Sequence, residues 1–154
     1  METDKDKLTG KVVYQHDNST IKLVTSFTES LFLIESDKIN KAEELFYTIY
    51  SELKTKEGET EPMLNLLAWK DKGQYILALF LRKKHRPSCF FEEGDGNILL
   101  SPASVDMGGV FITPLEKDFN KMELKDIITI LDEVCESSEV ALDVGNRVGQ
   151  KLKT

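Results

Sequence analysis

The chain has 154 residues, of which 40% are hydrophobic and 31% are charged, and its formal net charge is −7. These values are ordinary for a globular protein of one domain, which at this length is expected to bury roughly 70% of its unfolded surface. The acidic balance, with a pI near 4.9, argues against general nucleic-acid binding, because such a partner is normally met by a basic face.

Neither a membrane span nor a secretory leader is predicted. No apolar run approaches the roughly 18 residues that a spanning helix needs, and the N-terminus METDKDKLTG is too charged for a signal peptide. Cys89 and Cys135 are the only two cysteines and do not form a Cys-x-x-Cys pair. The sequence therefore predicts a cytoplasmic protein with two free thiols.

The first third of the chain predicts a hairpin and a third strand. Residues 11–15 and 21–25 are β-branched runs on either side of the turn formers His16-Asp17-Asn18-Ser19, and residues 31–35 form a further apolar run.

A helix is predicted next. Ser36 or Asp37 is the candidate N-cap, and the helix should end near Lys54, before the polar loop 55–61. Its apolar residues recur at helical spacing: Ile39, Ala42, Leu45, Phe46, Ile49, Tyr50 and Leu53.

The centre of the chain predicts a second hairpin. Residues 63–70 and 74–82 are apolar runs joined by the three residues Asp71-Lys72-Gly73. The apolar residues do not alternate, which predicts strands covered on both faces, either by helices or by another polypeptide surface.

The last third predicts short strands at 98–100 and 110–113 and an amphipathic helix at 126–135. Residues 139–152 show a narrow apolar stripe interrupted by Gly145 and Gly149, so this last helix is predicted to be marginal. The expected fold is α+β, an antiparallel sheet of about five to seven strands with two or three helices packed on it. Residues 1–137 are expected to form the domain and residues 138–154 a tail.

A cationic cluster is the first candidate site. Arg82, Lys83, Lys84 and Arg86 carry four positive charges, which leaves −11 for the rest of the chain. Arginine matches phosphate oxygens with a planar fork, and lysine adds a point charge, so the cluster predicts a phosphate or nucleotide site. The alternative is a solvated loop in which Lys83, Lys84 and Arg86 pair weakly with Glu92 and Glu93.

A paired-glycine segment is the second candidate. Gly108 and Gly109 follow Asp106 and allow a close backbone approach in which consecutive N–H groups bind an anion. A tight turn or bulge requires the same residues. Histidine is the side chain suited to acid–base chemistry at physiological pH, so His85 is a candidate acid–base group, or else a surface histidine.

The sequence contains no motif for catalysis, metal binding or a cofactor. The two histidines, His16 and His85, are not paired, and neither a phosphate-binding Walker loop nor a nucleophile elbow is present. The segment Asp95-Gly96-Asn97 is too short for a calcium loop and is predicted to be a turn at a hairpin tip. No catalytic residue, metal ligand or cofactor is therefore predicted.

Two runs carry a family resemblance: EPMLNLLAWKDKGQYILALFLRKKHRPSCFF and LLSPASVDMGGVFITPLEKDF. Over residues 61–135, and more loosely at METDKDKL, the chain resembles the C-terminal part of an uncharacterised bacterial family related to ATP adenylyltransferases and nucleotide-sugar phosphorylases, in the histidine-triad superfamily. The resemblance implies an enzyme of two related α+β halves, with a nucleophilic histidine in a His-x-His-x-His/Gln motif in one half.

This chain departs from that pattern, because neither of its histidines has a second histidine two residues away. The resemblance therefore implies the other half, which supports the substrate pocket, and the acidic start fits a chain that begins at a boundary between domains. The candidate phosphate- or nucleotide-binding residues are Asn65, Arg82, Lys83, His85, Arg86, Asp106, Gly108 and Gly109.

Two hypotheses follow. In the first, the chain is the non-catalytic half of a nucleotidyltransferase or phosphorylase, and its partner is a catalytic half-domain. In the second, it is an interaction module that self-associates through the apolar hairpin and binds no nucleotide. Neither hypothesis includes a nucleic-acid or membrane partner. Under the first, changing Arg82 and Arg86 together to alanine should abolish ligand binding and leave the fold intact.

Overall fold

The structure is a computed structural model that describes residues 10–25 and 29–153. Within these residues, five strands form one antiparallel sheet in the order β1-β2-β3-β5-β4, which confirms the predicted α+β class. The strands are β1 (Lys11–His16), β2 (Ser19–Val24), β3 (Leu31–Ser36), β4 (Leu64–Asp71) and β5 (Gln74–Leu81). The helices are α1 (Ile39–Tyr50), α2 (Ser104–Met107), α3 (Glu116–Lys121), α4 (Leu124–Val134) and α5 (Ser138–Lys151), with 3₁₀ turns η2 (Ser88–Phe91) and η3 (Gly94–Gly96).

Both predicted hairpins are present, and each turns in two residues. Asp17 and Asn18 connect β1 to β2, with Asp17 at φ +49°. Asp71 pairs with Gln74 inside the second ladder, so the connection there is Lys72-Gly73 and the predicted three-residue loop was wrong by one residue. Lys72 and Gly73 have φ of +45° and +83°, as in a type I′ turn, whose twist matches the twist of the strands.

Helix α1 differs from its prediction at both ends. Its N-cap is Lys38, and the Ser36 hydroxyl accepts a hydrogen bond from the Lys38 N–H at 3.1 Å without being the cap itself. The helix ends at Tyr50 and not near Lys54, because the next turn tightens: the Leu53 N–H donates to the carbonyl three residues earlier, on Tyr50, at 3.1 Å.

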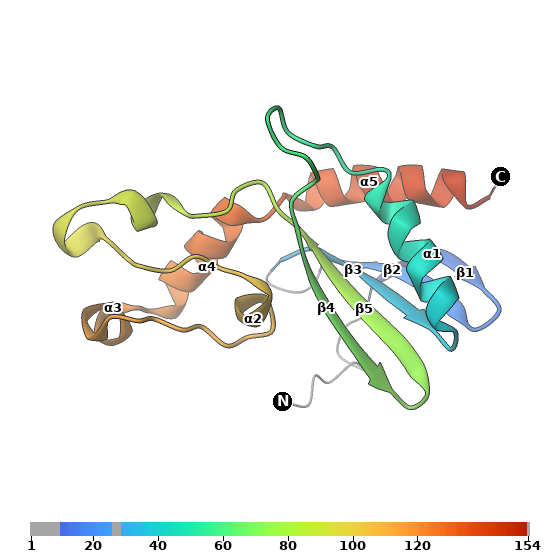
Figure 1. Cartoon of the computed structure of the whole chain (residues 1–154), viewed down its shortest axis with the longest axis horizontal. Helices are drawn as coiled ribbons and strands as arrows, with labels where there is room; N and C mark the ends of the chain where they lie inside the picture. Colours follow the sequence, from blue (N-terminus) through green and yellow to red (C-terminus); the bar gives the residue numbers. More distant parts are fainter. Residues whose placement is uncertain (1–9, 26–28, 154) are drawn as a thin grey trace.

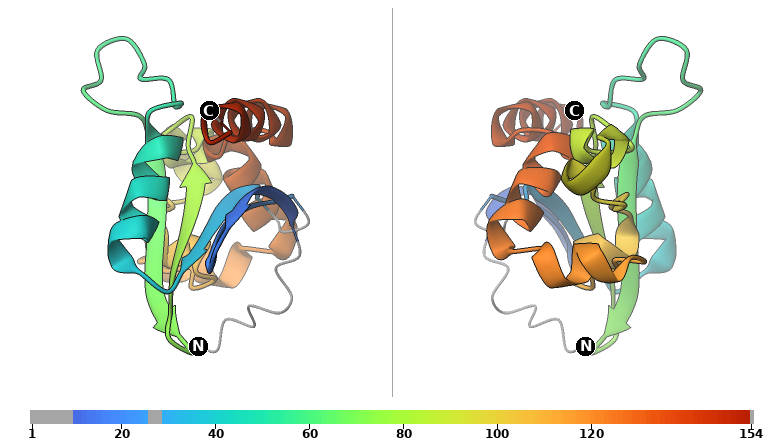
Figure 2. Two further views of the ribbon diagram at one scale, coloured as in Figure 1. Left: turned by 90° about the vertical axis from the view of Figure 1, so that its right-hand side faces the viewer. Right: turned by 90° about the vertical axis from the view of Figure 1, so that its left-hand side faces the viewer.

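Helices of the same chain cover both faces of the sheet (Figures 1 and 2). Helices α1 and α5 lie on one face, where α1 packs on β3 and β5 and α5 packs on β1 and β2. Helix α4 and the short α2 cover the other face. In β5, Leu79 and Leu81 enter the first core, whereas Ala78 and Phe80 enter the second. The apolar pattern of β5 is thus satisfied within the chain, without another polypeptide.

The predicted marginal helix forms in full as α5 and belongs to the first core. Ala141, Val144 and Val148 are buried in it. The interrupting glycine Gly145 faces the sheet, where a Cβ would lie 3.5 Å from the ring of Phe32. Packing against β1 and β2 therefore stabilises a helix whose local propensity is poor.

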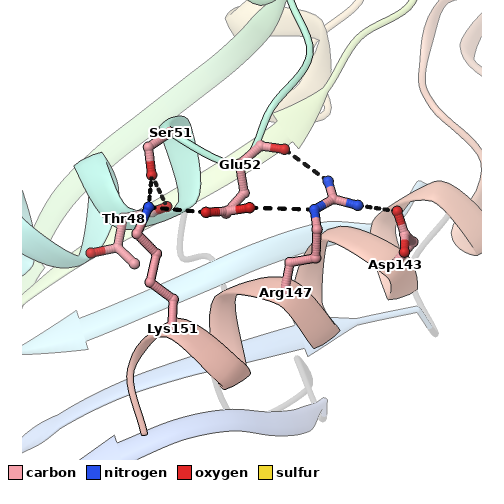
Figure 3. A network of polar contacts seen from close by, with 6 residues as sticks. All are labelled: Thr48, Ser51, Glu52, Asp143, Arg147 and Lys151. Atoms are coloured by element: carbon pink, nitrogen blue, oxygen red, sulfur yellow. Dashed lines mark hydrogen bonds and ion pairs between the residues drawn. The ribbon is translucent and has the colours of Figure 1, made fainter. Parts of the chain in front are cut away.

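Polar contacts connect α5 to the end of α1 (Figure 3). Arg147 donates from Nη2 to the Glu52 carbonyl at 2.8 Å and from Nη1 to Asp143, while its Nε lies 3.3 Å from the Glu52 carboxylate. Lys151 Nζ donates to Ser51 Oγ at 2.8 Å and to Glu52 Oε1 at 3.0 Å. Lys151 and Arg147 together lower the pKa of Glu52. These contacts fix the register of the two helices on the sheet.

The strands predicted at 98–100 and 110–113 do not form. Acceptors outside any strand take a backbone N–H of each run: the Leu99 N–H donates to the Asp118 carboxylate at 2.9 Å, and the Val110 N–H donates to the Val105 carbonyl at 3.3 Å. The predicted hairpin tip at Asp95 is accordingly the 3₁₀ turn η3, since no strands flank it. The runs are too short to be strands without a partner strand to pair with.

Residues 88–128, which we call the arm, include η2, η3, α2, α3 and the start of α4. Helix α2 packs on β4, whereas α3 lies away from the sheet (Figure 1). Both cysteines are free thiols.

Candidate functional site

A cleft of about 890 Å³ lies where the sheet meets the arm. One wall is the segment 59–65, which leads into β4, and the floor is the segment 82–86, which follows β5. Phe91 and residues 101–103 complete the cleft. Five of the eight predicted residues line it, namely Asn65, Arg82, Lys83, His85 and Arg86.

Arg82 forms the base of the cleft and is 92% buried, since its exposed fraction is 8%. Its Nη1 donates to the Pro102 carbonyl at 2.7 Å and to Asn65 Oδ1. Its Nη2 donates to the carbonyls of Lys84 at 2.8 Å and His85 at 3.1 Å. Burial lowers the pKa of Arg82. The guanidinium therefore holds three chain segments together, and its Nη atoms are not free for a ligand.

The two lysines point toward α4 and not toward Glu92 and Glu93, so those pairings were predicted wrongly. Lys84 Nζ lies 2.6 Å from Glu133 Oε1, and Lys83 Nζ donates to the Asp132 carbonyl at 2.8 Å. Both acceptors lie in the last turn of α4, where the helix dipole favours positive charge. Hydrogen bonds from Lys84 and Ser88 lower the pKa of Glu133 to about 2.

His85 and Arg86 are the cations that remain available in the cleft. The His85 side chain is 73% exposed, and its Nε2 lies 3.9 Å from Glu59 Oε1. The guanidinium of Arg86 lies 4.3 Å above the ring of Phe90 and, within the described residues, makes no hydrogen bond or ion pair. Stacking on a ring leaves the edge N–H groups of an arginine open to an anion.

The remaining three predicted residues lie outside the cleft. Asp106 is buried, and its carboxylate accepts a hydrogen bond from the Ala103 N–H at 2.7 Å. The N–H groups of Gly108 and Gly109 donate to the carbonyls of Ser104 at 3.1 Å and Asp106 at 2.9 Å. Gly109 has φ +88°. In this geometry the segment ends α2 with a tight turn and offers no free pair of N–H groups to an anion.

Sequence reasoning missed two parts of the cleft. The acidic wall, Glu59 and Glu61, was predicted only as a polar loop. Phe91, which is 69% exposed, follows the cationic cluster closely in sequence, and this proximity was the available signal. The wall and Ser101–Ala103 are far from the cluster in sequence and are brought to it only by the ladder of β4 with β5 and by the bonds of Arg82.

Comparison of the chain with protein-family models, curated proteins and solved structures finds no match. The relationship to the histidine-triad superfamily stays a prediction from the sequence. No helix within residues 10–25 and 29–153 is long and apolar enough to cross a membrane.

Proposed function

We propose that the cleft binds a phosphate-bearing ligand of the nucleotide class and that this chain serves as a binding half, without a nucleophile of its own, for a catalytic half. Three kinds of group line the same cleft and support this function. His85 and Arg86 present cationic donors, Phe91 presents an exposed ring, and Glu59 and Glu61 present carboxylates.

Each group suits one part of a nucleotide. Arginine and protonated histidine bind phosphate oxygens, an exposed aromatic ring stacks on a base, and carboxylates accept hydrogen bonds from sugar hydroxyls. The volume of about 890 Å³ lies in the range of sites that enclose small ligands. Plain phosphate would use the cations alone, so the ring and the carboxylates favour the larger ligand.

A thermal-shift screen against ATP, ADP, GDP, nucleotide sugars and inorganic phosphate tests this function. A ligand at a hundred times its Kd adds about 2.7 kcal/mol, which raises the Tm of a domain of this size by roughly 5–10 °C. We expect Arg86→Gln to remove most of the shift caused by nucleotides. Lys153→Gln, which removes one exposed charge outside the cleft, should leave the shift unchanged.

The variants must be chosen with the burial of Arg82 in mind. The double change of Arg82 and Arg86 to alanine is not neutral to the fold, because Arg82 holds the cleft together. Single changes at Arg86 and His85 avoid this problem, since both residues are exposed. Equal Tm shifts from phosphate and from nucleotides would mean that the site binds simple anions and does not recognise the rest of a nucleotide. No shift with any ligand would favour the second hypothesis, a self-associating module.

A further inference from the structure

The arm carries most of the large hydrophobic residues that are exposed in the described chain. Nine of the fourteen large hydrophobic residues that are exposed in the described chain lie within it. The most exposed apart from Phe91 are Phe119 at 74%, Leu124 at 71% and Ile112 at 64%. A contiguous exposed apolar patch marks an interaction surface, whereas scattered single residues do not. Leu124 and Ile128 are brought together in space, because both line one cavity with Phe111.

A small apolar notch lies at the root of this surface. It is a cavity of about 160 Å³, walled by Phe80, Phe111, Leu124, Ile128 and Leu131, with Glu29 among its lining residues. This volume is similar to the roughly 150 Å³ of an engineered cavity that accepts benzene. The notch therefore has room for one long side chain, and the exposed Leu124 and Ile128 form its rim.

Glu29 gives the notch an unsatisfied polar group. The residue is only 6% exposed, and its Oε1 atom has no hydrogen-bond partner among residues 10–25 and 29–153. Leaving a buried carboxyl oxygen unpaired is costly, and a donor that enters with an apolar stem removes this cost. Lys83, whose charge acts on Glu29, donates to the Asp132 carbonyl instead.

The charge of the arm indicates the sign of the charge that its partner carries. Residues 88–128 contain eight carboxylates and three lysines, which gives −5. The lysines are already engaged: Lys117 Nζ lies 2.7 Å from Asp118, Lys125 Nζ lies 2.7 Å from Glu123, and Lys121 donates to the Asp95 carbonyl. A second copy of this acidic chain would be repelled, whereas a basic segment is attracted.

We propose that the arm docks a basic, apolar polypeptide segment of a partner protein, with one lysine of that segment entering the notch. The methylene stem of this lysine packs on Phe111 and Leu131, and its ammonium group donates to the Glu29 carboxyl. Neighbouring apolar side chains of the partner cover Leu124 and Ile128. The notch shares no lining residue with the nucleotide cleft, so this proposal does not depend on the function proposed above.

The test uses a labelled 14-residue amphipathic helical peptide of leucine and lysine, titrated with the full chain and followed by fluorescence anisotropy. We expect saturable binding that weakens at least about tenfold, or ~1.4 kcal/mol, in Leu124→Ser and in Glu29→Gln. The matched control is Ile39→Ser, which changes an equally apolar residue, 52% exposed, on α1. It should leave the affinity unchanged. A peptide with glutamate in place of lysine should not bind.

Three results would overturn the proposal. Equal affinity for Leu124→Ser and Ile39→Ser would mean only a general attraction to an acidic protein. Absence of binding up to a peptide concentration of about 1 mM, the weak end of specific recognition, would show that the arm has no such docking site. A dimer of the chain that Leu124→Ser dissociates would make a second copy the occupant. Leu124 is exposed, so the test holds even where Glu29→Gln unfolds the protein.

Discussion

Arg82 is the residue on which the local structure of the cleft depends. A buried guanidinium is costly unless its donors are paired, and here two nitrogens reach the Pro102, Lys84 and His85 carbonyls together with Asn65. The planar fork reaches several acceptors at once, which lysine cannot do. The sequence identified this residue correctly as important but assigned it to a ligand, because a count of charges cannot distinguish a buried cation from an exposed one.

We expect Arg82→Met to lower the free energy of unfolding by roughly 3 kcal/mol or more, because it leaves buried carbonyls without donors. Arg82→Lys should not restore this loss. Arg86→Met, at an exposed position, should stay within about 0.5 kcal/mol of the parent. Urea denaturation measures all three variants. Equal stabilities of Arg82→Met and Arg86→Met would show that the Arg82 bonds contribute nothing to the fold.

At the scale of elements, α5 shows how packing overrides propensity. Its two glycines disfavour a helix in isolation, but Val144 and Val148 are buried against the sheet, and Arg147 and Lys151 bind the end of α1. The helical spacing of the valines was visible in the sequence. The surface on which they pack was not, because β1 and β2 lie more than a hundred residues earlier in the chain.

Gly145→Ala should stabilise the protein. An added Cβ meets its nearest atom, on Phe32, at 3.5 Å, which is an ordinary contact, and alanine gains roughly 0.5–1 kcal/mol over glycine within a helix. The Tm should therefore rise by about 1–4 °C. Gly73→Ala is the matched opposite: its φ of +83° is strained for alanine, so the Tm should fall. A lower Tm for Gly145→Ala in a melt followed by circular dichroism would refute the proposed fit.

At the scale of the whole molecule, two carboxyls with large pKa shifts change the stability in opposite directions as the pH rises. Burial, together with the neighbouring Asp132, raises the pKa of Glu29 from 4.5 to about 7, against the opposing effect of Lys83. The stability that a raised carboxyl pKa gives is complete below pH 4.5 and is lost as pH rises through 7. The lowered pKa of Glu133, about 2, gives stability above pH 4.5 that is lost as pH falls toward 2.

The contributions of these two groups therefore sum to a maximum near pH 4.5–5. Between pH 5 and 8 Glu29 should lower the free energy of unfolding by up to ~3 kcal/mol. Glu29→Gln should flatten the stability profile over this range, which chemical denaturation at several pH values measures. If the slope above pH 5 is the same in Glu29→Gln and in the parent, another group is responsible for it.

The sequence by itself determined the elements whose signals are local. The spacing of apolar residues and the turn-forming residues placed both hairpins, the third strand, α1 and α4. These patterns depend only on residues that are close to one another along the chain. It also identified the cationic cluster. Five of the eight candidate site residues line one cleft.

Only the tertiary structure decided what those residues contact. The strands predicted at 98–100 and 110–113 failed because a strand needs a partner strand, and Asp118 and α2 accept hydrogen bonds from these runs instead. Arg82 and the two lysines turned inward to carbonyls and to α4, and Glu59 joined the cleft from a loop more than twenty residues away. Burial and long-range pairing are set by which segments meet in space, and one sequence read along its length does not contain that information.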